Sequence, residues 1–186
     1  MLPKPPPPGP APTANDPAAN DPADVVRAVV AGVTRLIVGD LTPEEREHTL
    51  DELADLYSEQ TAVRHPLAPL GDHPMHTRAE LRAHFAGGPG RTSGVHTFAP
   101  VGMVVHQTTD PEVVIAEFAY AITTDRGAFT VPCIFVVRVR AGRIIESRDY
   151  ADSLAFARAF GQLPSLAQAL AAEDAQAMGF TAAEPA

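Results

Sequence analysis

Two acidic side chains stand on predicted strands at positions where a buried strand ordinarily carries an apolar residue. Glu117 lies within a strand predicted over 112–123, and Asp149 lies near the end of a strand predicted over 143–150. A carboxyl group that is desolvated in an apolar cavity has its pKa raised toward neutrality, so it can take up and release a proton at physiological pH. Both positions therefore suggest general acid–base chemistry, and two such groups in one pocket push their pKa values apart.

Alternation along each strand indicates which side chains accompany the two acids. Ile115 shares a face with Glu117, and Ile145 and Ser147 share a face with Asp149. We expect these three residues to line the pocket beside the acids. The alternative is that the faces meet solvent or a second subunit, where the acids would pair with lysine or arginine.

One histidine is suited to the same chemistry. His65 ends a short strand predicted over 61–65, directly before Pro66, and a side chain at that point can overhang a pocket as a base or a hydrogen-bond donor. His73 and His76 lie close together in the following loop. Because a metal site needs three or more ligands in a fixed geometry, we expect no metal here and no cofactor.

The predicted strand over 128–140 presents Cys133 and Phe135 on one apolar face. We expect Phe135 to line the pocket. A buried thiol without an activating base is ordinarily inert, so Cys133 is not predicted to act as a nucleophile. The chain also lacks the G-x-S-x-G motif of serine hydrolases.

The elements that position these residues follow from hydrophobic periodicity. Helices are predicted over 23–38, from Thr42 through an apolar stripe that ends at Tyr57, and from Thr77 to about 86. A Thr-x-x-Glu capping box marks the start of the second helix and of the third. Period-two patterns then predict strands, and a last helical region is expected to split at Pro164. These strands and the last helical region span 96–107, 112–123, 128–140, 143–150 and 151–173. Short polar connections make the strands antiparallel. The order predicts an α+β fold with helices on the concave face of a strongly curved sheet, enclosing a cavity.

Composition limits the function further. The 186 residues suit one domain over 23–173, between a Pro- and Ala-rich disordered tail at 1–22 and a second tail at 174–186. A net charge of −9 argues against nucleic acid as a partner. No apolar run reaches the roughly 18 residues that a membrane span needs. One cysteine and the absence of an apolar signal segment fit a cytoplasmic location.

Four stretches in this order and spacing resemble a known family. They are DELADLYSEQTAVRHP at 51–66, RAELRAHF at 78–85, EVVIAEF at 112–118 and GRIIESRDYAD at 142–152. The chain resembles a SnoaL-like protein of the nuclear transport factor 2-like superfamily, over about 24–170. That resemblance implies a cone-shaped α+β fold, commonly a homodimer. Relatives include polyketide cyclases, ketosteroid isomerases and limonene-type epoxide hydrolases.

The resemblance also carries residue roles. Asp149 matches the cavity acid of epoxide hydrolases and polyketide cyclases in the superfamily. His65 stands before a proline, where ketosteroid isomerases place a general-base aspartate. The Arg-x-Asp pair of the epoxide hydrolases is replaced here by Glu117-Phe118-Ala119, which weakens the prediction of epoxide hydrolysis.

The favoured hypothesis is therefore a cofactor-independent isomerase or cyclase acting on a hydrophobic carbonyl compound. Asp149 or His65 would remove the proton, and the other, with Glu117 or Tyr57, would stabilise the enolate. The alternatives are a binding protein that holds an apolar ligand in the same pocket, an epoxide hydrolase-like activity, and a structural homodimer whose acids form interface pairs.

Overall fold

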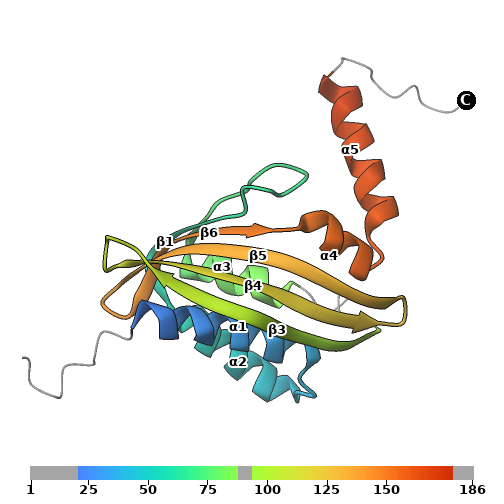
Figure 1. Cartoon of the computed structure of the whole chain (residues 1–186). Helices are drawn as coiled ribbons and strands as arrows, with labels where there is room; N and C mark the ends of the chain where they lie inside the picture. Colours follow the sequence, from blue (N-terminus) through green and yellow to red (C-terminus); the bar gives the residue numbers. More distant parts are fainter. Residues whose placement is uncertain (1–20, 88–93, 178–186) are drawn as a thin grey trace, which may run out of the picture.

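The computed structural model describes residues 21–87 and 94–177, which form a curved sheet with the first helices of the chain on its concave side (Figure 1). The helices are α1 (Pro22–Val38), α2 (Pro43–Asp55), α3 (Arg78–Ala86), α4 (Ser153–Ala159) and α5 (Leu163–Ala177). The strands are β1 (Tyr57–Arg64), β2 (Met75–Thr77), β3 (Val95–Gln107), β4 (Val113–Thr124), β5 (Gly127–Arg140) and β6 (Arg143–Ala151). The predicted α+β class and the curved sheet are confirmed. No helix among the described residues is long and apolar enough to span a membrane.

Two capping boxes fix the starts of α2 and α3. The Thr42 hydroxyl accepts a hydrogen bond from the backbone N–H of Glu45 at 3.2 Å, and the Glu45 carboxylate accepts one from the Thr42 N–H at 2.9 Å. Thr77 and Glu80 repeat this exchange at α3. Each pair satisfies backbone donors that a helix start leaves without partners, and both boxes were predicted from the sequence.

The sheet brings together the first and the last strand of the chain, β1 and β6. Its strand order is β2-β1-β6-β5-β4-β3, and every neighbouring pair is antiparallel except β1 with β6, which run parallel. The core fills the space between the concave face and α1, with Val25, Val30, Val114 and Val131 at most 1% exposed. In β4 the even-numbered residues from Val114 to Ile122 are buried.

Three details differ from the sequence prediction. Tyr57 begins β1 rather than ending the second helix, and β2 lies in a segment that was predicted as loop. Pro22 already belongs to α1, whose first turn is capped by Asp21. The last helix continues to Ala177, past the predicted boundary at 173, while residues 1–20 and 178–186 of the predicted tails lie outside the described residues.

The last helical region divides as predicted, but at the residues before Pro164. Gly161, between α4 and α5, has a φ of 69°, a left-handed conformation that glycine adopts without steric cost. The chain changes direction there. Figure 1 shows α5 leaving the body of the protein on the side of the sheet opposite α1 and α2.

Candidate functional site

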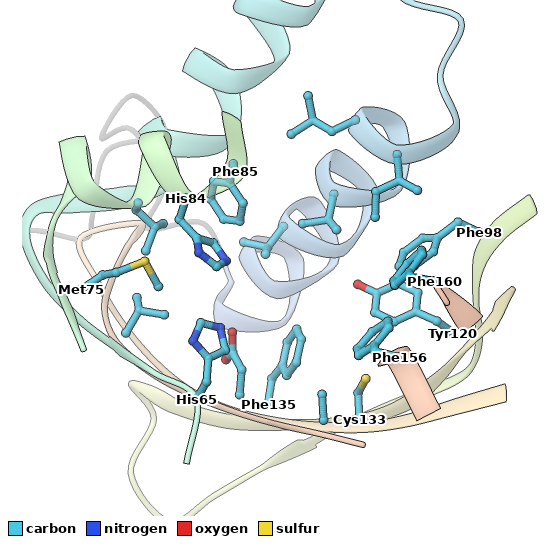
Figure 2. Close-up of a pocket in the computed structure, with 18 of the residues that line it drawn as sticks. His65, Met75, His84, Phe85, Phe98, Tyr120, Cys133, Phe135, Phe156 and Phe160 are labelled. Carbon is cyan, nitrogen blue, oxygen red and sulfur yellow. The ribbon is translucent and has the colours of Figure 1, made fainter. Parts of the chain in front are cut away.

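A cavity of about 360 Å³ lies between the concave face of the sheet and the helices. It has two chemically different ends. Aliphatic side chains of α1 form one wall and aromatic side chains gather at the α4 end (Figure 2). The histidines and Asp149 lie near β1 and β6. No lysine or arginine is among its described lining residues, so among these residues only His65 and His84 can carry a positive charge.

Asp149 is the acid in this cavity. A bulge in β6 determines its direction: Arg138 of β5 pairs with Glu146 and the next residue, Val139, pairs with Ile144, so Ile145 is an extra residue in the ladder. Beyond the bulge, Ser147 and Asp149 face inward. The predicted inward direction of Asp149 is therefore right.

The surroundings of Asp149 favour its neutral form. It lines the cavity, and burial raises the pKa of its carboxyl group above the ordinary value, because desolvation disfavours the charged form. A hydrogen bond that the Ser147 hydroxyl donates to Asp149, and the nearby His65, partly offset this rise in pKa. Within the described residues Asp149 forms no salt bridge.

Two buried tyrosines share the electrostatic environment of Asp149. Tyr57 on β1 and Tyr120 on β4 are each 3% exposed, and both line the cavity. Burial raises the pKa of both phenols above the ordinary value, and the charge of Asp149 raises both further. Both hydroxyls therefore stay protonated. In Figure 2 the hydroxyl of Tyr120 points toward the middle of the cavity, where a neutral phenol can donate a hydrogen bond to a ligand oxygen.

His65 lies at the end of β1 and its ring stacks on that of His84 from α3, with the ring centroids 5.4 Å apart (Figure 2). Asp72 fixes the backbone here. Its carboxylate accepts hydrogen bonds from the His65 N–H at 2.9 Å and from the Arg64 guanidinium at 2.6 Å. These hydrogen bonds, together with β1, position the His65 ring at the polar end of the cavity.

The opposite end of the cavity is aromatic. Phe156 of α4 stacks on Phe160 with centroids 5.8 Å apart, and lies 6.4 Å from Phe98 of β3. Tyr120 completes this group, 4.2 Å from Phe98. Flat apolar surfaces of this kind favour the rings of a ligand, while its polar group would lie toward Asp149.

The remaining predicted pocket residues divide between the two faces. Phe135 lines the cavity, and Ser147 lies beneath Asp149 in a small adjoining pocket. Glu117 and Ile115 lie on the outer face of β4, where the Glu117 side chain is 67% exposed and 3.6 Å from His106. The prediction that these two line the pocket is wrong, because Phe118 and Tyr120 take the inner face. The prediction that Ile145 lines the pocket is also wrong. Ile145 is the extra residue of the bulge, and Ile144 is buried instead.

Sequence reasoning missed two of the polar side chains. The predicted inward direction of Glu117 implies an outward Tyr120, although a large amphipathic ring between Phe118 and Ile122 is a signal for burial. His84 is not among the predicted pocket residues, because its stacking on His65 depends on how α3 packs on β1. Cys133 lines the cavity as well, but burial raises the pKa of its thiol to about 12, so it stays protonated.

Comparisons with known proteins agree with this fold. A family model described as a SnoaL-like domain matches residues 41–147. Among solved structures, a Bacillus subtilis protein provisionally named an isomerase superposes with a TM-score of 0.60 at 21% identity, covering 76% of this chain and 94% of that one. Bal32a, from a soil-derived mobile gene cassette, gives 0.53 at 23% identity, covering 76% and 98%.

A third structure is a Pseudomonas putida protein provisionally named a polyketide cyclase, with a TM-score of 0.53 at 16% identity, covering 74% of this chain and 96% of that one. At these identities the solved structures show that the fold is shared. No curated protein sequence matches the chain significantly.

Proposed function

Because the chain belongs to the SnoaL-like domain family, whose model matches 107 of its 186 residues, we propose that it is an acid–base enzyme. It acts on a neutral, hydrophobic carbonyl compound by isomerisation or aldol-type cyclisation. The observation that carries the proposal is the carboxyl group of Asp149. It is desolvated, it forms no ion pair within the described residues, and it faces a cavity that also contains two protonated phenols.

In the proposed reaction Asp149 is the general base. Its carboxylate removes a proton from the carbon next to the substrate carbonyl, and the electron pair of that C–H bond moves onto the carbonyl oxygen as an enolate. Tyr57 and Tyr120 donate hydrogen bonds to this oxygen as its charge develops, which lowers the barrier in a site of low dielectric constant. Protonated Asp149 then returns the proton to a different carbon, or the enolate carbon attacks a second carbonyl and closes a ring.

His65 has a second role in this proposal. Its ring lies at the polar end of the cavity, near enough to Asp149 to influence the pKa of the carboxyl group. In a cyclisation the newly formed alkoxide needs a proton, and we assign this donation to His65. Glu117 has no part, because it lies on the outer face.

Proton exchange at carbon tests the base without knowledge of the natural substrate. The protein is incubated in D₂O with 1-tetralone or 1-indanone, and loss of the α-proton signal is followed by NMR. We expect exchange above the buffer rate that disappears in Asp149→Asn. Exchange that is equally fast in Asp149→Asn would remove Asp149 from the role of base.

A non-catalytic binding protein is the second candidate. The observation that favours it is the aromatic end of the cavity, where Phe98, Phe156 and Phe160 provide stacking surfaces without any reactive group. Native mass spectrometry of the purified protein distinguishes the two functions. A ligand that is retained and released unchanged after prolonged incubation favours binding, whereas conversion of that ligand favours catalysis.

A homodimer in the cytoplasm completes the proposal. The outer face of the sheet exposes apolar side chains, with Val104 52% and Ile134 44% exposed, and a second copy would cover them. Sedimentation velocity at micromolar concentration tests this assembly. A monomer at that concentration would contradict it.

A further inference from the structure

We propose that α5 is an arm that binds a second copy of this chain. The helix has few contacts with its own body, since α4 is its main neighbour, and Figure 1 shows it projecting on the outer side of the sheet. A helix of 15 residues is marginal in water unless another surface covers its apolar side. This inference rests on the homodimer proposed above and does not depend on the reaction in the cavity.

The arm has a continuous apolar stripe. Leu163, Leu166 and Leu170 recur at spacings of three and four, which places them on one side of the helix. Leu163 is 39% exposed. Leucines at this spacing are typical of helices that pair with other helices.

An open apolar groove lies at the base of the arm. Its volume is about 670 Å³, and Leu170 of α5 forms one side of it. The other side includes Ile134 of β5 and Leu154 of α4, which are 44% and 57% exposed. Ile134 also belongs to the outer face proposed above as a dimer surface, so the groove and that face are continuous.

The charges along the arm indicate that the occupant of the groove is a second copy. Near its base lie two exposed cations, Arg158 on α4 and Arg126, whose guanidinium group packs against the backbone of Gly161. Near its tip lie Glu173 and Asp174. None of the four forms an ion pair within residues 21–87 and 94–177.

A two-fold axis pairs these charges. If two arms run antiparallel, the acidic tip of each lies beside the basic base of the other, and each arm fills the groove of its partner. Such a symmetric contact would bury the leucine stripe, fill the groove and pair all four charges with opposite charges. The dipole of α5 disfavours acids near its own C-terminal end. In the antiparallel pair these acids would lie near the positive N-terminal end of the partner helix, which stabilises them.

Sedimentation velocity of the full chain tests the apolar stripe. We expect the double variant Leu166→Glu/Leu170→Glu to raise the dissociation constant of the dimer by roughly a hundredfold or more. The matched control is Gln168→Glu/Ala172→Glu, which adds the same charge on the opposite side of α5 and should assemble as the wild type. A monomeric wild type, or an unchanged mass in the stripe variant, would overturn the proposal.

Charge reversal in two chains tests the pairing directly and avoids disrupting the stripe. One variant carries Glu173→Lys/Asp174→Lys, and the other carries Arg126→Glu/Arg158→Glu. We expect each alone to dissociate and an equimolar mixture to form a heterodimer, because both tip-to-base contacts are then between opposite charges. Two variants that remain monomeric after mixing, or that each assemble as well as the wild type, would show that the arms do not pair in this way.

Discussion

Asp149 and Glu117 occupy similar sequence contexts and opposite sides of the same sheet. Each is an acid on a strand rich in apolar residues. Asp149 faces the cavity, where burial raises the pKa of its carboxyl group and Ser147 donates a hydrogen bond to it. Glu117 is 67% exposed on the outer face beside His106. The same functional group is therefore a candidate base at one position and a solvated surface charge at the other.

The difference teaches that strand alternation sorts side chains into two sets without saying which set is buried. In β4 the set with the larger rings is buried, because Phe118 and Tyr120 fill the space below α1 and α4. The small residues around Glu117 cannot fill that space. In β6 the extra residue Ile145 interrupts the alternation between inward and outward side chains, so Ile144 and Ser147 both face inward ahead of Asp149.

The largest difference in rate is expected between variants that each lack one of the two carboxylates. We expect Asp149→Asn to lower the α-proton exchange rate by about 10²–10⁴-fold, the usual contribution of a general base. Glu117→Gln, the matched change on the outer face, should leave the rate within about twofold. Equal losses in the two variants would erase the distinction between the faces.

The tyrosines give the next largest effect. Tyr57→Phe and Tyr120→Phe each remove one donor to the developing enolate, and we expect rate losses of roughly 10²-fold each. The third tyrosine serves as the control, because Tyr150 lines the outer groove rather than the cavity. Steady-state kinetics should show the loss in kcat with little change in KM. A loss confined to KM would assign the tyrosines to binding alone.

Ser147→Ala should have a smaller, pH-dependent effect. The serine hydroxyl lowers the pKa of Asp149, so its removal should move the acidic limb of the pH–rate profile to higher pH. One hydrogen bond of this kind changes the rate on that limb by roughly threefold to tenfold. At high pH, where Asp149 is ionised in both proteins, the rates should converge. A uniform loss at every pH would indicate a structural role for Ser147 instead.

The smallest effect is on stability. The folded-state pKa of Asp149 is raised, so the folded protein binds this proton more tightly than the unfolded chain does. The free energy of unfolding therefore falls as the pH rises from the unfolded pKa, about 3.9, through the folded pKa. We expect Asp149→Asn to be more stable than the wild type at neutral pH and to lose that advantage in acid. Urea titrations at several pH values measure this difference, and Glu117→Gln should show no such trend.

Local sequence signals predicted much of the fold. The Thr-x-x-Glu pairs located two helix starts, and the change from helical to period-two spacing located four strands. The site was predicted less completely. Asp149 was singled out because an acid replaces an apolar residue on its strand, and His65 because it ends a predicted strand directly before Pro66. His84 and Tyr120 were missed because their place in the cavity depends on how α3 packs and on which face of β4 is buried.

The parallel pairing of β1 with β6 has a consequence for the order of folding. Thr61 donates a hydrogen bond to the carbonyl of Ile144, 83 residues away in the sequence. Tyr57 and His65 meet Asp149 only after this long loop has closed, and contacts of such separation form slowly. During synthesis on the ribosome, we therefore expect the first helices and the hairpins to form before Tyr57 and His65 meet Asp149. We expect the cavity to be completed last, so nascent chains should acquire ligand binding only once β6 has emerged.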